Sequence, residues 1–337
     1  MSDDRIASEA ELIALLAPLT RGAPGAFGLR DDCARLRPRL GFDLVLKTDP
    51  IRAGVHFFPD DPPDCIGWKA LAVNVSDLAA KGGTPVAYLM ALSFPEAPTR
   101  AWMTQFVTGL SEAQAAFGCH LIGGDSDRAP GPISVGVTAI GEVPEGTMVR
   151  RGTARAGDAI YVSGTLGDAG LGLRLRREQR EGKRELRERW GLSDSLADSL
   201  VQRYLKPQPR IELAGTLRQH ASAAMDVSDG LVKDLERMSK ASGVGAEINS
   251  DLLQFSKAAG SVLSWYPEDF CKIVAAGDDY EILAAVSPGE REAFRSKVQK
   301  IPVGMHRIGT FVEGAGVVVK RIDGSVITFD RTGWDHF

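Results

Sequence analysis

The stretch KALAVNVSDLAA, residues 69–80, has the apolar content of a buried helix that is broken by a few polar side chains. Asn74 and Asp77 are three positions apart, so a helix places both on the same face. A carboxylate among such apolar neighbours is costly unless a cation or hydrogen-bond donors compensate it. We therefore favour a ligand role for Asp77 over an ordinary solvated position.

Other short acidic clusters are spread along the chain at wide intervals. They are Asp31-Asp32, Thr48-Asp49, Gly123-Gly124-Asp125, Asp226-Val227-Ser228-Asp229 and Asp278-Asp279. Carboxylates gathered from distant parts of a sequence are a common way to hold Mg²⁺ against a polyphosphate. The pattern predicts metal-assisted phosphate chemistry.

Two of these clusters also have a simpler interpretation. Asp31-Asp32 equally suits a turn, and Gly123-Gly124 suits a tight turn after a strand-like segment over 120–122, with Asp125 at the strand end. Thr48-Asp49, in contrast, is expected at the end of an apolar strand, which is a usual place for site residues. His56 either has a structural role or hydrogen-bonds a phosphate.

The usual phosphate-binding loops are absent from the sequence. No Gly-x-x-x-x-Gly-Lys-Ser/Thr motif occurs, and residues 167–172 do not complete Gly-x-Gly-x-x-Gly. The kinase-type His-Arg-Asp motif and zinc-binding spacings are also missing. Metal ions and a few cations such as Arg150 would have to neutralise any phosphate.

The composition excludes several classes of protein. Of 337 residues, 44% are hydrophobic and 25% charged, and the net charge is −4 with dispersed Lys and Arg, so no nucleic-acid partner is expected. The charged run over 174–189 reads as a solvated helix face. The four cysteines form no Cys-x-x-Cys pair, and no apolar run approaches the roughly 20 residues of a membrane span. We expect a cytoplasmic protein with reduced thiols and no membrane contact.

Periodicity predicts an α+β protein of two domains, residues 1–150 and 151–337, with a polar link near 150–157. The expected helices cover 9–19, 64–81, 99–117 and 230–242, with helical patterns up to about 205. The expected strands cover 44–47, 87–94, 133–143, 158–163, 223–226, 272–275, 280–286 and 316–320, followed by a turn at 323–324. Residues 74–78 weakly echo 226–230, by common ancestry or by chance.

Together these motifs, in this order, resemble those of the thiamine-monophosphate kinase family within the aminoimidazole ribonucleotide synthetase-like ATP-binding superfamily. The resemblance covers residues 31–337. The matching segments are 31–34, 48–49 with 54–57, 69–80, 121–125, 226–231, 277–281 and the C-terminal GWDHF, residues 333–337.

The resemblance implies ATP-dependent phosphorylation of thiamine monophosphate to thiamine diphosphate with several Mg²⁺ ions. It also implies a homodimer in which the N-terminal domains pair their sheets into a β-barrel. Residues are assigned by matching positions. The metal ligands would be Asp32, Thr48, Asp49, Asp77, Asp125, Asp226 and Asp229; Gly124, Asp125, Arg150 and Ser228 would contact the nucleotide; His56, Asp278 and Trp334 would contact the thiamine substrate.

Three positions depart from the family pattern. Arg30 stands where a glycine is usual, Ala276 replaces the first glycine before Gly277, and Lys47 replaces a small hydroxyl residue. An ammonium at Lys47 could occupy the space of one metal ion. We hypothesise that the protein binds one Mg²⁺ fewer than its relatives, or that Lys47 contacts a phosphate directly.

Rival functions remain within and beyond the superfamily. A selenophosphate synthetase needs a reactive cysteine near the N-terminus, for which Cys33 qualifies only by proximity. The hydrogenase maturation factor ends in a reactive cysteine, whereas this chain ends in His336-Phe337. A non-catalytic nucleotide sensor, with Lys47 blocking transfer, is the alternative of a different class.

Overall fold

The protein is described by a computed structural model that covers residues 4–335 in detail. Residues 336 and 337 of the C-terminal motif lie outside the described residues. The chain divides into two compact units, one formed by residues up to Leu78 with Gly83–Thr147, the other by Ala79–Gly82 with Met148 onward. Among residues 4–335, no helix combines the length and apolarity that crossing a bilayer requires.

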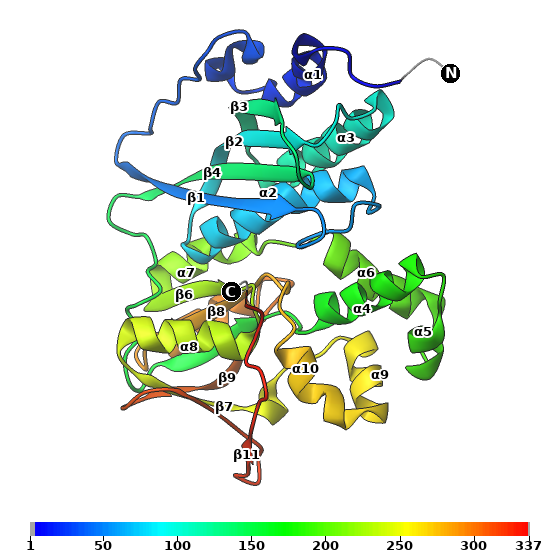
Figure 1. Cartoon of the computed structure of the whole chain (residues 1–337). Helices are drawn as coiled ribbons and strands as arrows, with labels where there is room; N and C mark the ends of the chain where they lie inside the picture. Colours follow the sequence, from blue (N-terminus) through cyan, green and yellow to red (C-terminus); the bar gives the residue numbers. More distant parts are fainter. Residues whose placement is uncertain (1–3, 336–337) are drawn as a thin grey trace. The chain divides into compact units, whose positions relative to one another are not determined.

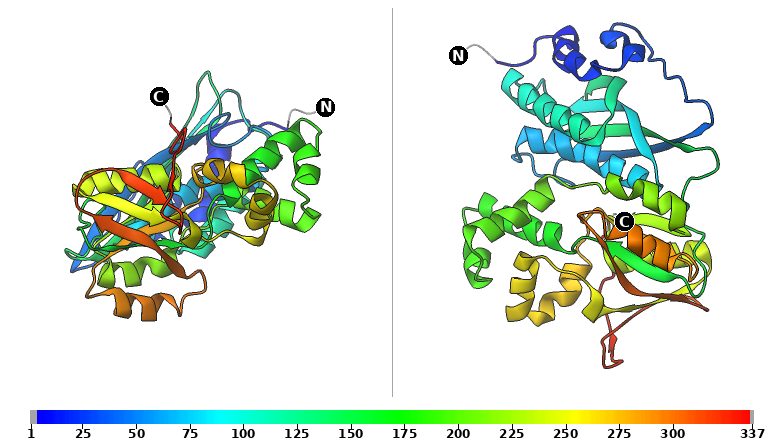
Figure 2. Two further views of the ribbon diagram at one scale, coloured as in Figure 1. Left: turned by 90° about the horizontal axis from the view of Figure 1, so that it is seen from below. Right: turned by 180° about the vertical axis from the view of Figure 1, so that it is seen from behind.

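The first unit is built on a four-stranded sheet with the order β1-β4-β2-β3. Its strands are β1 (Phe42–Arg52), β2 (Thr84–Phe94), β3 (His120–Arg128) and β4 (Ser134–Pro144). Only the β2–β3 pair is parallel. Helices α2 (Pro63–Ala80) and α3 (Arg100–Phe117) cover one face of this sheet (Figures 1 and 2).

Local sequence explains the helices of this unit. Helix α3 begins where Thr99 accepts a hydrogen bond from Trp102 N and ends at Gly118, whose φ of 72° is a left-handed cap. Helix α2 is buried from 65 to 76 on all sides, so it shows no polar face for most of its length. Helix α1 (Glu9–Leu16) is followed by the 3₁₀ turns Ala17–Thr20 and Pro24–Leu29.

The second unit contains a seven-stranded sheet with the order β11-β10-β7-β9-β5-β8-β6. The strands are β5 (Ala159–Ser163), β6 (Ala223–Val227), β7 (Gly245–Asn249), β8 (Glu281–Val286), β9 (Met305–Val312), β10 (Val317–Lys320) and β11 (Val326–Ile327). Helix α8 (Leu231–Ser242) covers one face, and α7 (Ala214–His220) with α11 (Arg291–Val298) covers the other.

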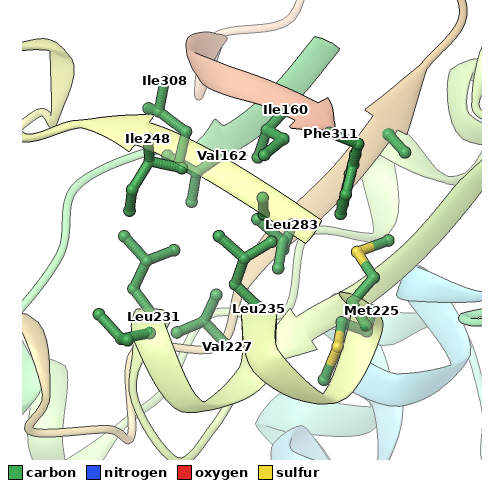
Figure 3. Close-up of a cluster of buried hydrophobic side chains, with 14 of the residues drawn as sticks. Ile160, Val162, Met225, Val227, Leu231, Leu235, Ile248, Leu283, Ile308 and Phe311 are labelled. Carbon is green, nitrogen blue, oxygen red and sulfur yellow. The ribbon is translucent and has the colours of Figure 1, made fainter. Parts of the chain in front are cut away.

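Alternating side chains supply both hydrophobic layers of this sheet. Ile160 and Val162 face α8, where Leu231 and Leu235 meet them in the cluster drawn in Figure 3. Tyr161 belongs to the opposite cluster with residues of α7 and α11. Beside the sheet lie the helices α4 (Asp168–Arg180), α5 (Glu185–Arg189), α6 (Asp194–Leu205), α9 (Lys257–Trp265) and α10 (Phe270–Val274).

The predicted elements are mostly confirmed, with three corrections. The strand expected over 272–275 is wrong: this segment is helix α10, because Pro267–Asp269 forms a 3₁₀ turn that leads directly into it. The strand expected over 44–47 runs on to Arg52, so Thr48 and Asp49 lie inside β1 and do not end it. Likewise β3 continues through Gly123-Gly124-Asp125, which is neither a tight turn nor the end of a strand.

Candidate functional site

Strand β1 and helix α2 hold the first group of candidate residues together. Asp49 and Lys47 are two positions apart on β1 and so lie on the same face of the sheet. The side-chain amide of Asn74 on α2 fixes this strand: its Oδ1 accepts from Asp49 N at 2.8 Å, and its Nδ2 donates to Asp49 O at 3.3 Å. Asn74 is fully buried, so these bonds are protected from water.

The ammonium of Lys47 lies between two carboxylates. Its Nζ is 2.9 Å from Asp49 Oδ2 and 2.8 Å from Asp77 Oδ2. All three side chains are partly exposed: Lys47 by 31%, Asp49 by 47% and Asp77 by 27%. Burial opposes the charged form of Lys47, but the two carboxylates outweigh it and hold the pKa above its usual range.

Thr48 and Asp125 belong to the opposite face of the sheet. Strand alternation turns Thr48 away from Lys47 and Asp49, and its hydroxyl donates to Val137 O at 3.2 Å and accepts from Thr138 at 3.0 Å. Asp125 on β3 pairs with Ala91 and is exposed, and its Oδ1 accepts from Ser126 N at 2.9 Å. The predicted ligands of the first unit are therefore divided between two faces.

Gly124 is required by a close approach of two strands. A Cβ at this position would lie 1.9 Å from the carbonyl oxygen of Met90 on β2, which no other residue could accommodate. Asp31 and Asp32 lie in an exposed bend before β1. In the part of the chain that the structure describes, neither Asp32 nor Asp125 forms an ion pair with a basic side chain.

His56 is held in a compact turn after β1. Its Nδ1 accepts a hydrogen bond from Arg52 N at 3.1 Å, and Gly54 N donates to Phe57 O at 2.8 Å with Gly54 at a φ of 82°. An accepting Nδ1 means that the neutral ring carries its proton on Nε2. The turn therefore orients the imidazole before any ligand arrives.

In the second unit, the turn after β6 gathers several candidates. Asp226 is the buried penultimate residue of β6, and Ser228 and Asp229 follow the strand. The carboxylate of Asp234 on α8 accepts hydrogen bonds from Ser228 N at 2.9 Å and from Asp229 N at 2.8 Å. Asp234 is fully buried, and burial raises its pKa although these donors oppose the rise. One buried side chain thus fixes the turn.

The loop before β8 lies beside this turn. Asp278 N donates to Ser228 O at 2.8 Å, and Tyr280 N donates to Val227 O at 2.8 Å. Asp278 and Tyr280 have left-handed φ angles of 60° and 51°, a conformation that non-glycine residues rarely adopt. Such strain persists only where surrounding contacts determine the backbone.

Two buried acidic residues, Asp279 and Glu281, hold that loop in place. Asp279 Oδ1 accepts from Gly167 N at 2.8 Å, while its buried Oδ2 has no hydrogen-bond partner within residues 4–335. Burial raises the pKa of Asp279 well above its usual range, against the effect of Arg203. Glu281, also fully buried, binds Arg203 at 2.9 Å and Arg210 through Nε at 2.8 Å.

The C-terminal segment completes this group. Trp334 N donates to Asp229 O at 2.8 Å, which places the backbone of this half-exposed residue next to the turn after β6. Asp229 is also bound by cations of α8: Arg237 is 2.5 Å and Lys233 3.8 Å from its Oδ2. The second unit therefore brings Ser228, Asp229, Asp278 and Trp334 together around one pair of loops.

The backbone of Arg150 lies at the opposite end of β6 from this group. Its carbonyl accepts from Ala224 N, at the start of β6, whereas Ser228 follows the end of that strand. Sequence reasoning missed Asp234, which positions the turn, and Arg237, which binds Asp229. Asp234 and Arg237 could have been found from the sequence, because both lie in the first two turns of the helix that follows Asp229-Gly230.

The fit to divalent metal ions differs between positions. Within residues 4–335, no three His, Cys, Asp or Glu side chains come together in a metal-binding arrangement. At Asp49 and Asp77 the ammonium of Lys47 already fills the space between the oxygens, and Asp229 is engaged by Arg237. The exposed carboxylates of Asp32 and Asp125 are oxygen ligands of the kind that Mg²⁺ prefers.

The class of the protein follows from comparing both halves with known families. Residues 30–143 match the N-terminal domain of AIR synthase related proteins, and residues 155–322 match their C-terminal domain. The fold is thus the two-domain α+β fold of that class.

Similar proteins narrow the class further. A curated thiamine-monophosphate kinase from Caulobacter vibrioides is 39% identical over 325 residues, which are 96% of this chain and 88% of the relative. The crystal structure of the thiamine-monophosphate kinase from Stenotrophomonas maltophilia K279a is 37% identical, with a TM-score of 0.82 over 96% of this chain and 98% of that one. A structure described as AaThiL complexed with AMPPCP and TMP is 32% identical, with a TM-score of 0.76 over 98% and 97% of the two chains. The chain belongs to the thiamine-monophosphate kinase family.

Proposed function

We propose that this protein transfers the terminal phosphoryl group of ATP to thiamine monophosphate and so forms thiamine diphosphate. The observation that carries the proposal is the near full-length similarity, up to 39% identity, to curated thiamine-monophosphate kinases. The relative bound to AMPPCP and TMP shares the fold across nearly the whole chain. Ser228, Asp229 and Asp278 stand together in two fixed loops, as a substrate site requires.

The chemistry of the acceptor explains why no catalytic base is needed. A phosphate monoester has its second pKa near about 6, so most of it is already dianionic at neutral pH. The acceptor oxygen is therefore nucleophilic without proton removal, and the main barrier is the repulsion between two polyanions. We infer direct in-line transfer without a phosphoenzyme, because no residue of the site needs to carry the group.

Cations must reduce this repulsion, and the predicted ligand set supplies their partners. We propose Asp32, Thr48 and Asp125 in the first unit, and Asp226 and Asp229 in the second, as ligands of Mg²⁺ beside the phosphates. Asp49 and Asp77, which are also predicted ligands, hold the ammonium of Lys47 between them. Bound Mg²⁺ would stabilise negative charge on the phosphoryl oxygens. The chain itself orients the partners, through Asn74 at Asp49 and through Asp234 at Asp229.

The remaining site residues would contact the two substrates. Gly124, Asp125, Arg150 and Ser228 are proposed for the nucleotide, and His56, Asp278 and Trp334 for thiamine monophosphate. The fixed ring of His56, with Nδ1 occupied by Arg52 N, would present Nε2–H as a donor to a phosphate oxygen. The partly exposed indole of Trp334 offers an apolar surface to the aromatic rings of thiamine.

A homodimer is proposed from the uncovered face of the first sheet. Leu44, Leu46 and Leu89 are exposed there by 37%, 65% and 37%, on the face opposite α2. Among the described residues the four strands form an open sheet in which β1 and β3 are edges. Pairing this face with a second copy would bury the leucines and could close the two sheets into a barrel.

The proposed location is the cytoplasm, where ATP is available. Within the described residues the four cysteines are free thiols, and Cys65 and Cys119 are buried. Burial raises the pKa of Cys119 to about 12, which makes this thiol unreactive. Reduced thiols are typical of cytoplasmic proteins.

The deciding assay uses purified protein with ATP, Mg²⁺ and thiamine monophosphate, and compares it with unphosphorylated thiamine as acceptor. Thiamine diphosphate should form only from the monophosphate. Binding of ATP without any product would instead indicate a nucleotide sensor. Radiolabelled phosphate that stays on the denatured protein after incubation with ATP alone would contradict direct transfer.

A further inference from the structure

The side chain of Lys47 occupies a position where a divalent ion would otherwise be expected. We propose that its ammonium is a built-in cation that takes the place of one Mg²⁺ between Asp49 and Asp77. This inference rests on the proposed function, because it concerns the cations that face the phosphates. It assigns to Lys47 a role that a small hydroxyl residue at the same position could not perform.

The distances exclude simultaneous occupation of this position. Nζ of Lys47 is 2.9 Å from Asp49 Oδ2 and 2.8 Å from Asp77 Oδ2, which are normal lengths for charge-assisted hydrogen bonds. Mg²⁺ binds oxygen at about 2.0–2.1 Å. An ion at that distance from both oxygens, on the side where the ammonium lies, would overlap the ammonium. The ammonium would have to leave before the ion could enter.

The fold keeps the lysine in this position. Strand alternation places Lys47 on the same face as Asp49, and the 11-residue register between β1 and β4 includes the pair Lys47 and Ala139. Asn74 fixes the backbone of Asp49, and Asp77 lies about one turn after Asn74 on α2. Both partners of the ammonium therefore come from backbone that is itself anchored.

The charges also favour one cation here. Two carboxylates and one ammonium leave a single negative charge, so an added divalent ion would meet a fixed positive charge within a few ångströms. Without the lysine the same two carboxylates would carry two negative charges, which is the arrangement that draws in a divalent ion. Lys47→Ser should therefore create a metal position that the native chain lacks.

The test counts Mn²⁺, used in place of Mg²⁺, in three full-length proteins with AMPPCP: native, Lys47→Ser and the control Lys320→Ser. Lys320 lies on β10 and pairs with Glu247 at 2.8 Å, so the control also removes an ammonium–carboxylate contact. Anomalous scattering locates the ions, and electron paramagnetic resonance of free Mn²⁺ counts them in solution. We expect one additional Mn²⁺ per subunit in Lys47→Ser, between Asp49 and Asp77, and no change in the control.

An equal Mn²⁺ count in all three proteins, or a Mn²⁺ peak between Asp49 and Asp77 in the native protein, would overturn the inference. Lys47→Gln keeps the length of the side chain and gives the same comparison if the serine variant does not fold. Product formation is measured separately. Failure of the native protein to form thiamine diphosphate contradicts the proposed function, whereas the metal count alone decides the role of Lys47.

Discussion

The chemical role of Asp77 on helix α2 depends on a residue of strand β1. Asp77 is the half-buried residue in an otherwise buried part of α2, and its carboxylate faces the ammonium of Lys47 on β1. The two residues are 30 positions apart in sequence, so the ion pair depends on the packing of α2 against the sheet. Both interpretations of this site place a cation at Asp77, which is either the ammonium of Lys47 or a metal ion from solution.

Asp77→Asn keeps the size of the side chain and removes its charge. We expect turnover to fall by about tenfold to hundredfold or more, the loss known for residues that support bound metal ions, with an unchanged circular dichroism spectrum. The control is Asp43→Asn, an exposed position on β1 whose carboxylate accepts from Gly146 N. Native turnover in Asp77→Asn would remove this residue from the cation-binding set.

His56→Ala tests the substrate side. Because the turn fixes the ring before binding, its loss should raise the KM for thiamine monophosphate by roughly tenfold, the effect of one lost hydrogen bond to a charged group. The KM for ATP should stay within error of the native value. His306→Ala, at an exposed position on β9, serves as the control. An effect confined to ATP would reassign His56 to the nucleotide.

The loops after β6 and before β8 depend on buried acidic groups of neighbouring elements. Asp234 on α8 binds the first loop, and Asp279 with Glu281 holds the second against Gly167, Arg203 and Arg210. Fully buried carboxylates are unusual unless hydrogen-bonded or paired. Burying these carboxylates costs free energy. We infer that they maintain the loop conformation, in which Asp278 and Tyr280 have left-handed φ angles.

Asp279→Asn should change how stability depends on pH. A folded-state pKa above the unfolded value means that the folded protein binds the proton more tightly, so stability falls as pH rises from about 4 toward the raised pKa. Asparagine cannot ionise, so the variant should lose less stability over this range. The measurement is urea unfolding at several pH values. Identical pH profiles of the two proteins would show that the pKa of Asp279 is not raised by folding.

At the level of the assembled protein, the uncovered sheet face makes a prediction about oligomeric state. Leu46, which is 65% exposed on β1, belongs to the face that the proposed dimer contact would cover. Leu46→Asp should convert a dimer into a monomer, because an unpaired carboxylate would be buried at the interface. Sedimentation equilibrium measures the mass. Ile322→Asp, at an 82% exposed position in the second unit, should remain dimeric.

Much of the architecture could be predicted because local patterns are strong. Helix α2 was expected from its apolar run and α8 from its period, and β4, β5, β6 and β8 were expected from branched residues between turn signals. The segment 272–275 was misjudged because four apolar-rich residues suit a strand or one helical turn equally well. Strands β7 and β9 went unnoticed, since glycine and polar residues such as Gly245 and Arg307 weaken their signal.

The amino-acid pattern was sufficient to find the acidic motifs, the α+β class and the family, because these depend on residue identity and short-range periodicity. Which residues form ion pairs and hydrogen bonds with one another is decided only in the folded chain. Only there do Lys47 and Asp77 meet, does Asp234 reach the backbone of Ser228, and do Thr48 and Asp49 separate onto two faces of one strand. The physical reason is that ion pairs and hydrogen bonds act over a few ångströms, and only long-range packing brings residues so distant in sequence that close.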